Sequence, residues 1–122
     1  MMITQLFLFL LLGVGDEAQR CREHTAVVGK CYVVHGRLRT YNGNPTFRIS
    51  PAGSKRILGV TGPQPGGEPV MPKGITCDFA FDCDVLGDFE VCPFTKQKTG
   101  VMQRVCLAGV KNRTVVERNR NK

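Results

Sequence analysis

Hydrophobic and polar side chains alternate along residues 31–60 with a period of two residues. That period is typical of a β-strand, whose successive side chains point to opposite faces of a sheet. Turn signals at 42–43 and 51–54 divide the run into three segments, so we predict a three-stranded β-meander. Its apolar face carries Tyr32, Val34, Leu38, Phe47 and Ile49, and its polar face carries Arg37, Arg39 and Arg48.

The Asn-Gly pair at 42–43 predicts the register of the first hairpin. Asn-Gly favours a two-residue type I′ turn, because both central residues of that turn need positive φ. Tyr41 would then face Asn44, and Arg37 would face Arg48. Like charges directly opposite one another are mildly destabilising in a sheet. Two explanations stay open: an acidic strand lies alongside, or the face binds an anionic ligand.

A candidate acidic strand follows later in the chain. Residues 77–92 carry apolar side chains at most odd positions and Asp or Glu at most even positions. This alternation predicts one or two half-buried strands. Residues 24–67, by contrast, contain six Lys or Arg and no acid. The charges are segregated in sequence, and folding can bring them together.

Carboxylates at Asp82, Asp84 and Asp88 raise the question of a Ca²⁺ site. An EF-hand loop starting at Asp82 would need an oxygen ligand at its fifth position and Glu at its twelfth. The chain has Leu86 and Pro93 there instead. The pattern therefore favours pairing with the basic meander over a metal site, and no metal is predicted.

Six cysteines indicate a disulfide framework rather than zinc ligation, because the chain has no C-x₂-C pair and only two histidines. Residues 87–94 and 101–108 predict a hairpin around 98–100. This hairpin places Cys92 opposite Cys106, and we predict a Cys92–Cys106 disulfide. The pairing of the other four stays open: Cys21, Cys31, Cys77 and Cys83.

The N-terminal segment 1–18 is predicted to be a signal peptide. Leu6–Val14 is an apolar run of signal-peptide length and too short to cross a bilayer. The alternative is a short buried strand or helix. Cleavage after Ala18 would remove two acids and no base, so the formal charge of +7 (17 − 10) would become +9 (17 − 8). We expect a periplasmic or secreted basic protein without a transmembrane segment in the mature chain.

The expected fold class is all-β, in one disulfide-stabilised domain over 19–110. A small antiparallel barrel is preferred, and it would be OB-like because a long first strand over 27–41 contains two glycine bend points. A two-sheet sandwich is the alternative. Residues 61–74 carry four prolines and four glycines and predict a loop, and 111–122 predict a basic flexible tail.

Two blocks of the chain resemble a group of small exported bacterial proteins. They are HGRLRTYNGNPTFRISPAGSKRILGV and GDFEVCPFTKQKTGVMQRVC, and the likeness covers about two thirds of the chain after the leader. The resemblance implies bacterial export and a shared fold. It carries over no activity and no functional residue.

The function predicted from these observations is a non-enzymatic binding module that presents a basic sheet face to an anionic envelope component or acidic protein. Arginine forks suit phosphate and carboxylate groups. One alternative is a structural or inhibitory protein acting through the loop 61–74. The disfavoured alternatives are nucleic acid as the ligand and a secreted OB-fold nuclease, since no catalytic constellation or cofactor site is evident. The predicted anion-binding residues are Arg37, Arg39, Tyr41, Arg48, Lys55 and Arg56.

Overall fold

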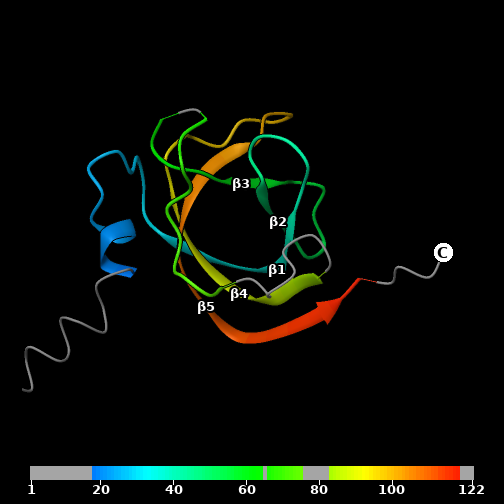
Figure 1. Cartoon of the computed structure of the whole chain (residues 1–122). Helices are drawn as coiled ribbons and strands as arrows, with labels where there is room; N and C mark the ends of the chain where they lie inside the picture. The colour runs from blue at the N-terminus through cyan, green and yellow to red at the C-terminus, as the bar shows by residue number, and fades with distance from the viewer. Residues whose placement is uncertain (1–17, 65, 76–82, 119–122) are drawn as a thin grey trace, which may run out of the picture.

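The computed structural model describes residues 18–64, 66–75 and 83–118. This part of the chain is nearly all β, with one short helix over 18–22, and it confirms the all-β prediction. Figure 1 shows the strands arranged around a common axis. The strands are β1 (Tyr32–Thr40), β2 (Phe47–Pro51), β3 (Leu58–Val60), β4 (Cys83–Pro93) and β5 (Gln103–Glu117).

The strands form one mixed sheet that closes into a ring in the order β1-β2-β3-β5-β4. Strand β1 closes the ring because it pairs with β2 on one side and with β4 on the other. Every pair is antiparallel except β3–β5, which is parallel. The prediction of a purely antiparallel sheet is therefore corrected.

The interior of the ring is filled by the apolar face that the sequence predicts. Side chains pointing inward alternate with outward ones along β1 and through the middle of β4, as the pleat requires. Tyr32, Val34 and Phe47 pack partly buried against this core. The buried core residues are Leu38, Ile49, Leu58, Val60, Ile75, Val85, Phe89, Val91, Val105 and Leu107.

The register of the first hairpin differs from the prediction by two residues. Arg39, not Arg37, lies opposite Arg48. A type I′ turn needs two positive φ angles, and in the connecting loop over 41–46 only Gly43 has one. Pro45 also lacks the N–H needed for a ladder hydrogen bond. A shift of two residues preserves the faces, so the three arginines still share the outer side.

A glycine in β1 permits the close approach of β2. A Cβ built on Gly36 would lie 2.4 Å from the carbonyl oxygen of Ser50. We expect Gly36→Ala to lower the free energy of unfolding by about 1–3 kcal/mol, because the strands must move apart. Gly109→Ala is the matched control, since a Cβ there meets nothing within 4 Å. Urea titrations in which both variants unfold at the same midpoint would contradict this packing.

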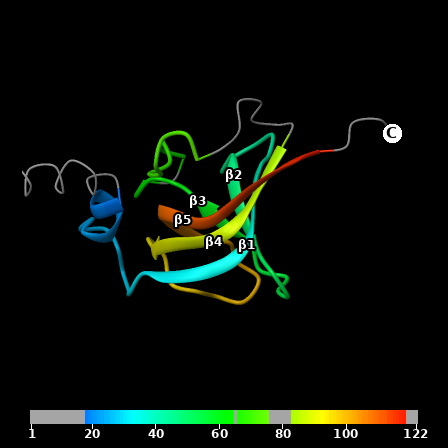
Figure 2. The same cartoon turned by 90° about the horizontal axis from the view of Figure 1, so that it is seen from below.

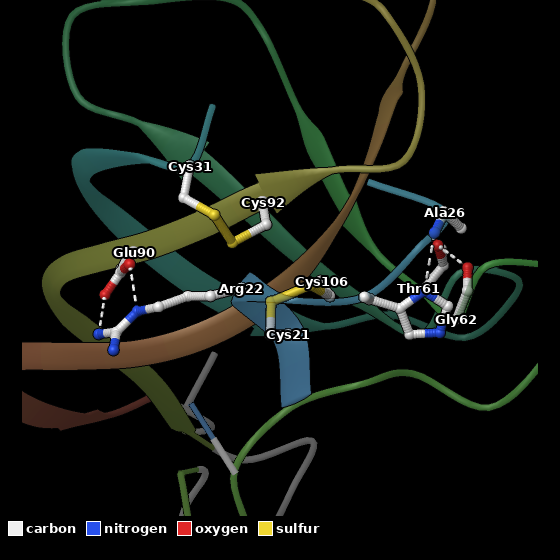
Figure 3. The surroundings of a disulfide bond; sticks show 10 residues. Cys21, Arg22, Ala26, Cys31, Thr61, Gly62, Glu90, Cys92 and Cys106 are labelled. Carbon is white, nitrogen blue, oxygen red and sulfur yellow. Dashed lines mark hydrogen bonds and ion pairs between the residues drawn. A yellow bond between two sulfur atoms is a disulfide. The ribbon is translucent and has the colours of Figure 1, made fainter. Parts of the chain in front are cut away.

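A second, smaller core lies outside the ring, between the chain N-terminal to β1 and the outer faces of β4 and β5. Two disulfides fasten it, Cys21–Cys106 and Cys31–Cys92. They lie close together, since the sulfur atoms of Cys21, Cys92 and Cys106 are within 4.8 Å of one another, and Cys21 belongs to the short helix (Figure 3). This second cluster comprises Cys21, Cys92, Phe94, Cys106 and Ala108, with Ala18, Ala26, Val27, Cys31 and Val70 packed against it.

The predicted Cys92–Cys106 disulfide is wrong, although its register is right. Cys92 does lie opposite Cys106. Both side chains point outward, where the N-terminal segment supplies a partner for each, so no bond forms between them. Cys83 is also disulfide-bonded. Cys77 lies outside the described residues.

The C-terminal segment is more ordered than its composition suggests. We predicted a flexible tail from 111, whereas β5 continues to Glu117 and pairs with β4 as far as Cys83. Its side chains are mostly exposed, so the segment lacks the apolar alternation that would indicate a strand. Figure 2 shows this end of β5 on the opposite side of the molecule from the short helix.

The loop predicted over 61–74 is anchored to the sheet near its middle. The Leu107 amide donates to the Val70 carbonyl, and the Val70 amide donates to the carbonyl of Thr61. Almost all of the predicted leader, 1–17, lies outside the described residues. Within the described ranges, the only helix covers 18–22, which is too short to cross a bilayer.

Candidate anion-binding face

The outward side chains of β1 and β2 bring three of the predicted arginines onto one surface. Arg37 and Arg39 alternate with core residues along β1, and Arg48 lies on β2 directly opposite Arg39. We call the outer surface formed by Arg37, Arg39, Arg48 and Tyr41 the arginine face. Strand β4 pairs with the other edge of β1, so the acidic strand lies alongside the basic one. This arrangement agrees with the first of the two explanations for facing arginines, an acidic strand beside them.

A single buried carboxylate organises the β1 side of this face. Asp84 Oδ2 accepts from Arg37 Nη1 at 3.0 Å, and its Oδ1 accepts from Arg39 Nε at 3.1 Å and from Arg118 Nε at 2.8 Å. The Asp84 side chain is only 3% exposed. Burial by itself raises the pKa of this carboxyl, but the hydrogen bonds and charges of Arg118 and Arg39 outweigh it, so the pKa is lowered.

Arginines outnumber acids around Asp84 in the described part of the chain. Among the described residues, three guanidinium groups bond to the one carboxylate of Asp84. The Arg37 and Arg39 side chains are 44% and 37% exposed, so both can reach a ligand while they hold Asp84. Arginine has five donors, and each ion pair with Asp84 uses one of them.

Arg48 is held by groups that leave its charge uncompensated. Its Nε donates to the Pro45 carbonyl at 2.9 Å, and its guanidinium lies over the Tyr41 ring, 4.5 Å from the centroid. Neither partner is a carboxylate, and within the described residues no ion pair to Arg48 is present. The stacked geometry orders the side chain before any ligand binds.

Lys55 and Arg56 do not belong to the arginine face. Both lie in the connection between β2 and β3, at the end of the ring where β1 begins. Arg56 Nη2 donates to Gln103 Oε1 at 2.8 Å, and Lys55 is exposed. The six predicted residues therefore divide into two groups. The arginine face keeps Arg37, Arg39, Tyr41 and Arg48, and the opposite end of the ring has Lys55 and Arg56.

The remaining described acids of β4 are also paired. Asp88 contacts His35 at 2.7 Å and Asn112 at 2.8 Å, and these hydrogen bonds, that of Asn112 first, lower its pKa. Glu90 accepts two hydrogen bonds from Arg22, which lower its pKa (Figure 3). In the described residues, the groupings with metal-ligand spacing contain disulfide cysteines rather than sets of acids. Asp82 of the Ca²⁺ hypothesis lies outside them.

Sequence reasoning missed Arg118, the third arginine at Asp84. It follows β5, inside the segment that composition assigned to a flexible tail. The pairing of Cys83 with Glu117 is what brings Arg118 to Asp84, and that register depends on bulges in the β4–β5 pair. The only sequence feature that points to Arg118 is the high proportion of basic residues within 111–122.

Comparison of the chain with protein-family models, with curated proteins and with solved structures finds no match.

Proposed function

We propose that this protein is a non-enzymatic exported binding module whose arginine face binds an anionic component of the cell envelope. The observation that carries the proposal is Arg48, an ordered guanidinium without a carboxylate partner in the described residues, directly opposite Arg39. Beside it, Arg37 and Arg39 are partly exposed while both bond to Asp84. A surface that concentrates positive charge attracts phosphate, sulfate or carboxylate groups.

The strand order supports an OB-like barrel as the scaffold. We infer this from a closed five-strand ring in which β1 pairs with β2 and β4 and in which β3 runs parallel to β5. OB-folds bind oligosaccharides and oligonucleotides over strands 2 and 3 and through the loops β1–β2 and β4–β5. Arg48 on β2 and Tyr41 at the start of the β1–β2 loop occupy that region.

Export is supported by the disulfides. Structural disulfides persist in oxidising compartments and are rare in the cytosol. Both bridges fasten the chain that follows the predicted leader to the sheet. A periplasmic or secreted location accounts for them.

Substitution of Arg48 tests the proposal. We expect Arg48→Gln to weaken binding to heparin, used as a soluble acidic glycan, by about tenfold, because one charge-assisted contact is lost. The affinity of the unmodified protein should also fall steeply with salt. Isothermal titration at two salt concentrations measures both effects.

Lys111→Gln provides the matched control. Lys111 is exposed on β5, so this substitution removes the same charge from another surface. It should change the affinity by much less than Arg48→Gln does. Equal losses in the two variants would show that net charge, rather than the arginine face, determines binding.

A further inference from the structure

A hollow lies at the end of the ring opposite the arginine face. It has a volume of about 530 Å³ and lies between the β2–β3 connection and the β4–β5 loop. We call the surface formed by residues 52–57 and 94–102 the loop end. The β4–β5 loop is the yellow-to-orange segment in Figure 2. The hollow is lined by Lys55, Arg56, Ile57, Gln97, Lys98, Thr99, Gly100, Val101 and Met102.

The loop end is purely cationic. Lys55, Arg56 and Lys98 line the hollow and no acid does, and neither 52–57 nor 94–102 contains Asp or Glu. Arg56, which lines the hollow, is held by a hydrogen bond to Gln103, and Gln103 also accepts one from the Tyr32 hydroxyl. Within the described residues, Lys55 and Lys98 form no ion pair. The charge is therefore available to a ligand.

Apolar side chains stand exposed among these cations. Val101 is 61% exposed and Ile57 is 36% exposed, although valine and isoleucine are ordinarily buried. The Val101 amide donates to the Lys98 carbonyl, so a closed turn over 98–101 holds Val101 beside Lys98. This position places an apolar side chain and a lysine next to each other on a fixed backbone.

We propose that the loop end docks on an anionic phospholipid surface. Lysines beside exposed aliphatic side chains complement a bilayer interface, where phosphates lie above the boundary of the acyl chains. Val101 and Ile57 contact that boundary, while Lys55 and Lys98 contact the phosphates. This contact is separate from the arginine face and leaves Arg48 free for its own ligand.

Co-sedimentation with vesicles tests the proposal. We expect binding to phosphatidylcholine vesicles containing one quarter phosphatidylglycerol and much weaker binding to phosphatidylcholine alone. Lys98→Gln should lower the partition coefficient roughly fivefold, the effect of one basic residue at an anionic surface. Val101→Ser should lower it severalfold, because it removes buried apolar area. High salt should reverse the Lys98 effect more than the Val101 effect.

Two variants on β5, away from the loop end, serve as matched controls. Val115→Ser removes a valine that is 44% exposed on β5, and Lys111→Gln removes an exposed cation from the same strand, outside both cationic surfaces. Both should bind vesicles as the unmodified protein does. The proposal is overturned if anionic vesicles do not bind, if Val101→Ser binds normally, or if Lys111→Gln loses as much binding as Lys98→Gln. Capture of polyglutamate at the loop end without vesicle binding would assign the surface to an acidic protein instead.

Discussion

We expect the double variant Cys31→Ala/Cys92→Ala to lose about 4 kcal/mol of unfolding free energy. The bridge spans 61 residues of sequence, and a cross-link over so long a loop restricts the unfolded chain strongly. It also fastens the second core, which has little apolar area of its own. Urea titration under non-reducing conditions measures the loss.

The pairing itself is open to a separate check. Peptide mapping of the non-reduced protein should recover Cys21 linked to Cys106 and Cys31 linked to Cys92. Val115→Ala, a substitution on the exposed part of β5, is the stability control and should change little. Recovery of a Cys92–Cys106 peptide would contradict the attachment of the N-terminal segment.

Asp84→Asn is expected to have the second-largest effect, a loss of about 3 kcal/mol. Asp84 is nearly buried beneath three arginines, and an amide cannot compensate their charge. Breaking a buried ion pair typically costs about 3–5 kcal/mol. Arg37 and Arg39 are partly exposed and can turn toward water, so we expect a cost at the lower end of this range. Asp88→Asn, which breaks a more exposed pair with His35, should cost less.

The stabilisation that Asp84 provides should depend on pH in a definite direction. The pKa of Asp84 is lowered by folding, because the arginines outweigh its burial. Its contribution is therefore complete above the unfolded pKa of about 3.9 and disappears as the pH falls through the lower folded value. Asp84→Asn should flatten the acid limb of a thermal-unfolding profile between about pH 5 and 2. Parallel curves for variant and unmodified protein would contradict the ion-pair cluster.

The sequence predicts the faces of the sheet better than its register. Alternation places Leu38 and Ile49 inside and Arg37, Arg39 and Arg48 outside, and the structure agrees. The register depends on the conformation of the loop. The Asn-Gly pair at 42–43 predicts a two-residue turn, but Pro45 shortly after it is incompatible with the ladder that this turn requires. A shift of two residues costs no change of face, so hydrophobic alternation alone cannot detect it.

The sequence could not predict which residues pair across long distances in the chain. Cys92 and Cys106 lie opposite each other as predicted, yet each bonds to a cysteine that precedes β1. Arg118 reaches Asp84 only because β5 continues through a polar segment. Both outcomes depend on contacts between segments far apart in the sequence, and neither leaves a periodic signal.

The two cationic surfaces have different chemistry despite their shared charge. The arginine face is built on strands around Asp84, whereas the loop end combines lysines with exposed aliphatic side chains. Variants at one surface should leave ligand binding at the other unchanged, since separated sites behave independently.

Side-chain NMR of the arginines tests the arginine face most directly. In a titration with heparin, we predict that the Nε–Hε signals of Arg48 and Arg39 shift first and by the largest amount. The Arg22 signal, held by Glu90 on another part of the surface, should stay in place. Shifts confined to other arginines, or no shift at Arg48 under conditions in which heparin binds, would contradict the proposed site.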